Sequence, residues 1–325
     1  MQGKEASEQE ILKCTAGIDV SKNWLDAHVI PGAESLRVAN TRDGIRQLKG
    51  WLLRRDVKLI AVEATGKWHR ELCRSLLASQ LAVAITDPYR VRMFAKAHGI
   101  LAKTDRLDAK VLAMFASMMA PCCRPPAPEA LEAIQELVTA RTSAVAEETA
   151  LKNQLSTATG AFPKRQLKQR IRQIAAHIQS LEKECLKQIN ADEGLARRFV
   201  ILISIPSFGS IVAMTLIAFL AELGSLTNKQ IGALAGLAPV ADDSGKRQGV
   251  RVIWGGRGQV RRTLYLAALS AQSCNKDMRT FYQRLIANGK SAKTALLAVA
   301  RKLATLANTL IAQDRLWQPQ AIQNT

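Results

Sequence analysis

The stretch CTAGIDVSKNWLDAHVIPGAESLRVAN, residues 14–40, contains three short runs of residues that favour β-strands. The runs cover 14–21, 25–30 and 34–40, and Pro31 and Gly32 form a turn signal between the last two. Runs this short, joined by turns, pair most simply with their sequence neighbours. The segment therefore predicts an antiparallel meander of three strands.

Two further runs, 58–64 (KLIAVEA) and 81–87 (LAVAITD), are almost continuously apolar, as expected of strands that are buried on both faces. Helices are expected between and after them, at 41–55, at 67–79, from Pro88 onward and at 104–120. A meander followed by helices that alternate with parallel strands is the element order of a ribonuclease-H-like α/β fold. We expect that fold, taking the acidic residues described below into account.

A break in the pattern follows at 122–128, where two cysteines, an arginine and three prolines come close together. Residues 129–190 then show helical periodicity with many charges. This region predicts a helical hairpin, either a coiled coil that pairs protomers or a plain hairpin packed on its own chain. Apolar, alanine-rich helical sequence follows. The predicted domains are therefore 1–121 (α/β), 129–192 (hairpin) and 196–315 (mostly α-helical).

Composition limits the partners. The 325-residue chain has 46 Lys and Arg against 27 Asp and Glu, a net charge of +19, which favours a nucleic-acid partner. Its six cysteines are scattered, as in reduced cytosolic proteins. The N-terminus lacks the apolar segment of a signal peptide, so we expect a cytoplasmic protein. The longest charge-poor stretch, 199–221, is interrupted by Pro206 and Gly209, which favours a buried hairpin over a membrane span.

Four carboxylates stand out. Asp19 lies inside the first strand run, Glu63 lies at the end of the strand run 58–64, and Asp105 and Asp108 are three residues apart on a predicted helix. Acids that converge from these elements repel unless a cation joins them, and oxygen ligands without His or Cys favour Mg²⁺ or Mn²⁺. Two such ions can clamp the attacking and leaving oxygens of a phosphodiester. Taken singly, each acid also fits an ordinary role as a helix-dipole, turn, solvated or ion-paired residue.

Ser244 begins a segment rich in glycine and arginine. No acid occurs between Asp243 and Asp277, and seven bases do. Glycine permits close approach to a phosphate and arginine contacts it in bidentate fashion, so we expect this segment to bind nucleic acid; the alternative is a solvated basic loop. A hydroxyl here could attack phosphorus, although a loop serine is the commoner role. The expected nucleic-acid-binding residues are Lys246, Arg247, Arg251, Arg257, Arg261 and Arg262.

Several spaced motifs resemble those of the DEDD-type transposases of bacterial insertion sequences, the group related to the pilin-gene invertases. In the N-terminal half these are GIDVSKNWLDAHV (17–29), VEATG (62–66) and KTDRLDAKVLA (103–113). In the C-terminal half they are IPSFG (205–209), AGLAPVADDSG (235–245), GRGQVRRTLY (256–265) and NGKSAKTALLAVARKLA (288–304). The resemblance implies that Asp19, Glu63, Asp105 and Asp108 are metal-site residues and that Ser244 is the nucleophile.

The resemblance also implies a RuvC-like N-terminal domain of the ribonuclease-H class, a DNA substrate and a homodimer or homotetramer. It further implies a structured noncoding RNA that guides the choice of DNA by base pairing. One residue departs from the motif, because Ser207 stands where many relatives have glycine, so a left-handed turn there would be strained. Three other functions stay open: a metal-dependent junction nuclease without a covalent intermediate, a binding module without catalysis, and an oligomeric scaffold.

Overall fold

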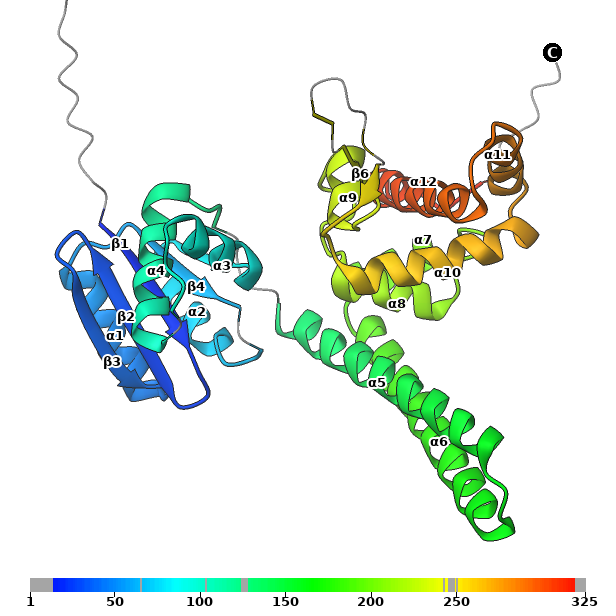
Figure 1. Ribbon diagram of the computed structural model, residues 1–325, viewed down its shortest axis with the longest axis horizontal. Helices are drawn as coiled ribbons and strands as arrows, with labels where there is room; N and C mark the ends of the chain where they lie inside the picture. The colour runs from blue at the N-terminus through cyan, green and yellow to red at the C-terminus, as the bar shows by residue number, and fades with distance from the viewer. Residues whose placement is uncertain are drawn as a thin grey trace, which may run out of the picture. The chain divides into compact units, whose positions relative to one another are not determined.

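The computed structural model describes residues 14–64, 66–102, 104–123, 128–241, 243–244, 249 and 251–318. The chain divides into two compact units, Met1–Ala127 and Pro128–Thr325, which are described separately (Figure 1). The division falls within the break predicted at 122–128. The further division of the second unit into a hairpin domain and a globular domain stays a prediction.

The first unit is a mixed five-stranded sheet with helices on both faces. Its strands are β1 (Thr15–Val20), β2 (Trp24–Ile30), β3 (Glu34–Ala39), β4 (Leu59–Glu63) and β5 (Val83–Thr86). Its helices are α1 (Arg42–Arg54), α2 (Arg70–Leu77), α3 (Pro88–Ala97) and α4 (Asp105–Met119). The strand order is β3-β2-β1-β4-β5, antiparallel through the first three strands and parallel from β1 to β5. The predicted meander and the two parallel strands are confirmed, whereas the assignment to the ribonuclease-H class stays a prediction.

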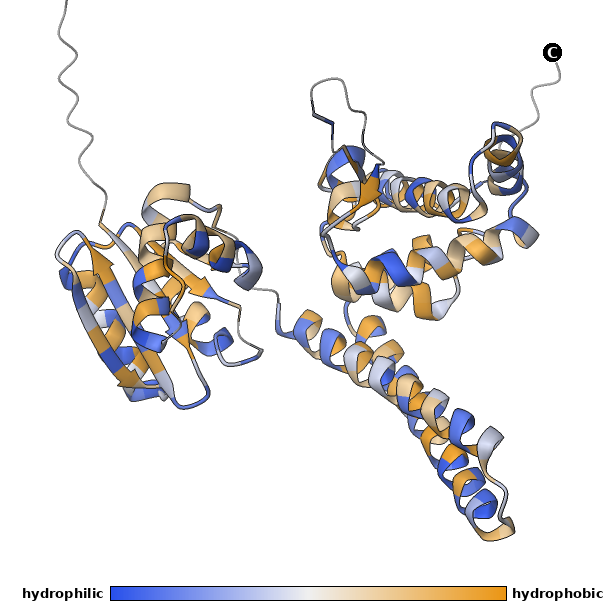
Figure 2. Cartoon of the chain, viewed as in Figure 1, coloured by the Kyte–Doolittle hydropathy of each residue, from blue (hydrophilic) through white to orange (hydrophobic). Residues whose placement is uncertain are grey.

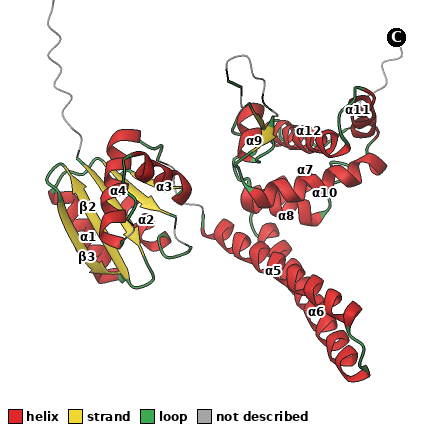
Figure 3. Cartoon of the chain, in the orientation of Figure 1, coloured by secondary structure: helices red, strands yellow, loops and turns green. Residues whose placement is uncertain are grey.

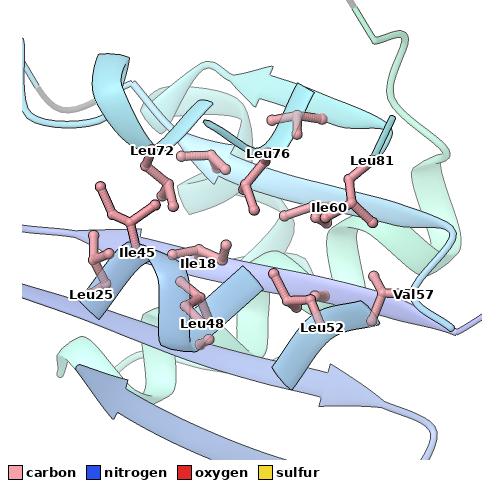
Figure 4. Packing of buried hydrophobic residues seen from close by; sticks show 14 of the residues in the cluster. Ile18, Leu25, Ile45, Leu48, Leu52, Val57, Ile60, Leu72, Leu76 and Leu81 are labelled. Carbon is pink, nitrogen blue, oxygen red and sulfur yellow. The ribbon is translucent and has the colours of Figure 1, made fainter. Parts of the chain in front are cut away.

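One face of the sheet carries the larger hydrophobic core. Ile18, Leu25 and Ile60 point to this face and are fully buried. They pack against apolar side chains of α1 and α2, as Figure 4 shows. Alternate residues of a strand point to opposite faces, so the neighbours of these residues lie on the other face. Figure 2 shows hydrophobic residues along the strands of this sheet.

The other face of β1 is lined by small and polar residues, and α4 lies directly on it. A Cβ on Gly17 would stand only 2.2 Å from the carbonyl oxygen of Ala109 and 2.2 Å from the amide nitrogen of Ala113. The Thr15 hydroxyl donates a hydrogen bond to the carbonyl of Ala113 at 3.2 Å. Only glycine therefore allows the α4 backbone to approach β1 this closely.

The second unit is helical apart from a short two-stranded ribbon (Figure 3). Its elements are α5 (Glu129–Thr157), α6 (Ala161–Asn190), α7 (Glu193–Ile203), α8 (Ser210–Phe219), α9 (Asn228–Leu234), β6 (Pro239–Val240), β7 (Val252–Ile253), α10 (Gly258–Cys274), α11 (Lys276–Ala287) and α12 (Ala292–Ala312). Helices α5 and α6 form the predicted hairpin, in which Arg141 and Glu182 make an ion pair at 2.7 Å. The Gln135 side chain donates to the carbonyl of Ala218 at 2.8 Å and joins the base of the hairpin to α8.

As expected, the charge-poor stretch 199–221 forms no single long helix. It is divided between α7 and α8 by a turn at 204–209. Among the described residues, α12 alone is long and apolar enough to cross a membrane by length and composition, and half of its most apolar window is buried. Its buried side chains include Val299, Leu303 and Leu310. The helix packs against α9, α10 and α11, so it is a central helix of this unit.

The six cysteines are free thiols, as their scattered positions suggested. Cys73 and Cys185 are buried and Cys14 is partly buried, while Cys122, Cys123 and Cys274 are exposed.

The expected strain at Ser207 is present. Its φ is +90°, a region that L-residues other than glycine rarely adopt. Its hydroxyl is also buried without a hydrogen-bond partner in the described part of the chain. The free energy of the turn between α7 and α8 is therefore raised both by backbone strain and by a buried hydroxyl without a hydrogen bond.

We expect Gly17→Val to destabilise the first unit by about 3 kcal/mol or more, because the side chain would overlap two backbone atoms of α4. Thermal or urea unfolding measures the change. Gly50→Ala is the matched control: a Cβ at Gly50 on α1 would meet only the flexible Arg54 side chain, at 3.4 Å. This control should be neutral or slightly stabilising, and equal losses in both variants would contradict the close contact of α4 with β1.

We expect Ser207→Gly to stabilise the chain by about 1 kcal/mol, because glycine relieves the positive φ and removes the unpaired hydroxyl. The midpoint of thermal unfolding measures the change. Ser207→Ala removes only the hydroxyl and should recover less stability than glycine does. An alanine variant as stable as the glycine variant would show that the backbone at this position is not strained.

Candidate active site

Two of the predicted acids lie side by side on parallel strands. Ile18 of β1 pairs in register with Val62 of β4, so the next residues, Asp19 and Glu63, are neighbours at the carboxyl ends of their strands. Asp19 is two residues beyond Gly17 and therefore points to the face that α4 covers. Ligands of parallel sheets commonly gather at this edge.

Helix α4 brings the other two acids to the same place. Thr15 contacts Ala113, and Gly17 contacts Ala109, so α4 runs antiparallel to β1. Two strand residues advance roughly 6.7 Å and four helix residues roughly 6 Å, so the two elements stay in step. One further step along both elements places Asp105 and Asp108, in the first turn of α4, over Asp19.

The electrostatics show that these carboxylates gather. Burial, followed by Asp108, Glu63 and Asp105, raises the pKa of Asp19 to about 6. Each of the other three predicted acids therefore acts on Asp19. In the described residues, no three His, Cys, Asp or Glu side chains are arranged as a ready-made metal cage. The acids share one region without forming a closed coordination shell.

Sequence reasoning missed a fifth acid and a base. Asp26 of β2 lies directly opposite Asp19 and is only 8% exposed. Arg37 of β3, opposite Asp26, has its guanidinium 3.6 Å from Asp26 and 3.4 Å from Asp105. Burial raises the pKa of Asp26, whereas Arg37 acts to lower it. Arg37 thus places a positive charge between two carboxylates at the rim of the cluster.

The donor set fits a hard divalent cation. The side chains that could hold one are those of Asp19, Glu63, Asp105 and Asp108, all of which offer carboxylate oxygens. The raised pKa of Asp19 reflects its burial first and then the negative charge of the other three acids, which a cation would neutralise. The side chain of Asp105 is 59% exposed, so its carboxylate is accessible from solvent.

Ser244 lies in the second unit, in the segment that connects β6 to β7. The side chain of Ser244 is exposed. The neighbouring Asp243 accepts from the amide of Gly249 at 3.1 Å and pairs with Arg251 at 3.4 Å. Asp243 therefore links the two sides of the connection between β6 and β7, and the adjacent Ser244 is accessible to solvent. Residues 242, 245–248 and 250 lie outside the described residues, among them the predicted contacts Lys246 and Arg247.

Three of the predicted DNA-binding arginines have partners within the chain. Arg251 pairs with Asp243. Arg257 makes a bidentate ion pair with Glu222 at 2.6 and 2.7 Å. Arg261 donates to the carbonyl of Gly255 at 2.7 Å. The last two side chains stabilise the start of α10, which the sequence alone does not reveal because their partners come from tertiary structure.

Arg262 is exposed and has no ion pair in the described part of the chain. The exposed Trp254, 68% accessible, lies between β7 and α10 in the same segment. Among the described residues of the segment, Arg262 is therefore the predicted contact whose charge is most available to a phosphate.

Two family models match the chain. Residues 16–163 match a model described as a transposase of the DEDD group of IS110, and residues 200–283 match one described as transposase of the IS116/IS110/IS902 family. The first match contains all four predicted metal-site residues, and the second contains Ser244. Together the two matches cover most of the chain.

Curated relatives agree with these matches. The chain is 25% identical over 319 residues to a pilin gene-inverting protein of Moraxella bovis, covering 93% of this chain and 97% of that protein. The corresponding protein of Moraxella lacunata is similar to the same extent. A 43.6 kDa protein of the insertion element IS110 in Streptomyces coelicolor is 33% identical over 104 residues, covering 31% of this chain and 26% of that protein. The chain therefore belongs to the IS110 family of DNA transposases and recombinases.

Proposed function

We propose that this transposase cuts and rejoins DNA with a serine nucleophile, Ser244, assisted by a divalent metal held in a RuvC-like first unit. The observation that carries the proposal is the packing of α4 on β1, which brings Asp105 and Asp108 to Asp19 beside Glu63. The strand order β3-β2-β1-β4-β5 supports the ribonuclease-H-like assignment. An exposed serine in a glycine-rich basic segment supports the role of the nucleophile.

The chemistry is an exchange of phosphodiester bonds. The oxygen of the Ser244 hydroxyl bonds to phosphorus and gives up its proton, and one bridging P–O bond of the DNA strand breaks. The products are a phosphoserine ester and a DNA strand that ends in a hydroxyl, which takes up a proton. Attack of a strand hydroxyl on the phosphoserine reverses the step and releases Ser244. The phosphodiester is exchanged and not hydrolysed, so rejoining the strands consumes no high-energy cofactor.

The acids would prepare the site for this exchange. Asp19, Glu63, Asp105 and Asp108 would hold Mg²⁺ or Mn²⁺, which when bound supplies positive charge to the oxygens at phosphorus. Arg37 pairs with Asp105 at the rim of the cluster. The Ser244 hydroxyl comes from the second unit of the same or of another protomer, so a homodimer or homotetramer is part of the proposal.

Sequence choice would come from a structured noncoding RNA. The net charge of +19 suits a protein that binds RNA and DNA together. Backbone contacts give affinity without reading bases, so base pairing between RNA and DNA would supply the specificity. The pilin gene-inverting relatives, whose name describes an inversion of DNA, support recombination over simple hydrolysis.

We expect Ser244→Ala to abolish the covalent protein–DNA adduct, with a loss of strand exchange of roughly a thousandfold or more, because no other group replaces the attacking oxygen. Denaturing gel electrophoresis with end-labelled DNA detects the adduct. Ser270→Ala, an exposed serine on α10, is the control and should keep full activity. Adducts that persist without Ser244, or cut ends that never carry protein, would favour a junction nuclease in which water attacks.

We expect Asp19→Asn to raise the unfolding temperature of the metal-free protein at pH 7.5 by a few degrees. The folded-state pKa of about 6 exceeds the ordinary aspartate value of 3.8, so the folded state binds more protons between these pH values. The stability linked to Asp19 is therefore fully present below pH 3.8 and is lost as pH rises through 6. The variant escapes this loss, so its advantage should shrink at pH 5.

The same comparison tests metal binding. Millimolar Mg²⁺ should raise the unfolding temperature of the wild type more than that of Asp19→Asn, because a ligand that binds only the folded state stabilises it. Asp43→Asn removes an exposed carboxylate of α1 and should respond to pH and Mg²⁺ as the wild type does. An Asp19→Asn variant that is less stable than the wild type at pH 7.5 would refute the clustering of the acids.

A further inference from the structure

The charges of the α5–α6 hairpin are segregated along its length. From residue 149 to residue 181, the distal part of the hairpin, the sequence contains six Lys and Arg and no acid. The remaining stretches of the two helices contain seven Glu and three Lys and Arg. Every residue of 149–181 is described, and the two family matches end at 163 and resume at 200. The basic half of α6 therefore lies outside the matched regions.

Four of the distal bases share one face of α6. Lys164, Arg165, Lys168 and Arg172 line a shallow groove of about 520 Å³ together with Ala161 and Gln169. Lys164, Lys168 and Arg172 follow one another at intervals of four residues, and Arg165 comes three residues before Lys168, so all four lie on one side of the helix. The face extends for about 12 Å along the helix axis, enough to meet several phosphates of a strand, which recur every ~3.4 Å along a duplex.

These four side chains are exposed and make no ion pair in the described part of the chain. By contrast, the distal bases that point elsewhere are neutralised. Arg170 pairs with Glu147 at 3.5 Å and Lys152 pairs with Glu148 at 2.8 Å, both with acids of α5. The hairpin thus neutralises the bases beside α5 and leaves a continuous row of positive charge on the outer face.

The start of α6 adds to this positive charge. Gly160 is the N-cap and has no side chain with which to cap the first turn of a 30-residue helix. The helix dipole places partial positive charge at this end, next to Lys164. Phe162 is 64% exposed, and the Arg165 guanidinium lies 5.4 Å from its ring centroid. Figure 2 shows hydrophilic residues recurring along α6.

We propose that this basic face, formed by Lys164, Arg165, Lys168 and Arg172, binds the sugar–phosphate backbone of duplex DNA away from the reacting phosphodiester. The inference rests on the DNA substrate of the transposase but not on its catalytic residues. Four cations on one helix face, with no ion-pair partner among the described residues and no acid between them, match the charge of a nucleic-acid backbone, whose phosphates carry no sequence information. The contact therefore adds affinity that does not depend on sequence.

The test compares two double variants of the full chain. Lys168→Gln with Arg172→Gln removes two charges of the basic face. Lys183→Gln with Lys187→Gln removes two exposed charges with the same spacing, farther along the same helix. Affinity for a labelled random duplex of about 30 base pairs is measured by fluorescence anisotropy between about 50 and 200 mM salt, in chelator so that no strand is cut.

The distal variant should bind DNA roughly 10- to 30-fold more weakly, and its slope of log affinity against log salt should fall by about 1.8. The control should keep the affinity and slope of the wild type. Unchanged unfolding temperatures would show that both variants fold. Because no strand is cut, failure of the Ser244 mechanism would not alter these outcomes.

Three outcomes would overturn the proposal. Equal losses in both variants would show only a general effect of net charge. A loss for duplex RNA of the same length but not for DNA would assign the face to RNA. A distal variant that binds DNA normally but changes its mass in sedimentation would assign the face to a second copy of the chain, in which the basic half of one hairpin meets the acidic part of another.

Discussion

The candidate active site depends on one close contact, between the backbone of α4 and the backbone of β1 at Gly17. Because no side chain separates the two elements there, they remain in step for two further residues of the strand. That distance is enough to carry the first turn of α4 to Asp19. A bulkier residue at Gly17 would lift the helix and separate the acids of α4 from those of the sheet, although no acid would be changed.

Holding these carboxylates together costs free energy, and the opposite face of the same sheet offsets the cost. The pKa of Asp19 is raised because burial and three like charges disfavour its ionised form. Ile18, the residue before it, points the other way into a core that includes Leu48 and Leu52. Each fully buried leucine or isoleucine contributes roughly 1.5–3 kcal/mol. Because consecutive side chains of a strand point to opposite faces, Asp19 can serve the site while Ile18 stabilises the unit.

Local patterns predict most of this architecture. The five strands, the helices that flank them and the break before Pro128 follow from short-range periodicity and turn residues, and the paired acids follow from their unusual place in apolar runs. Asp26 was missed because its role depends on register: the β1–β2 pairing places it opposite Asp19. Arg257 was predicted as a phosphate contact, but its guanidinium is held by Glu222, which is 35 residues away in the sequence and which no local pattern connects to it.

The arginines divide into those that shape the protein and those that can meet a polyanion, and only three-dimensional neighbours separate the two. Arg257 and Arg261 are fixed by Glu222 and by a backbone carbonyl, whereas Arg262 and the basic face of α6 are exposed and have no such partners among the described residues. A guanidinium that is already bonded would lose those bonds on turning to a phosphate, so its net gain is small. The net charge of the chain therefore overstates the number of its cations that are available to DNA.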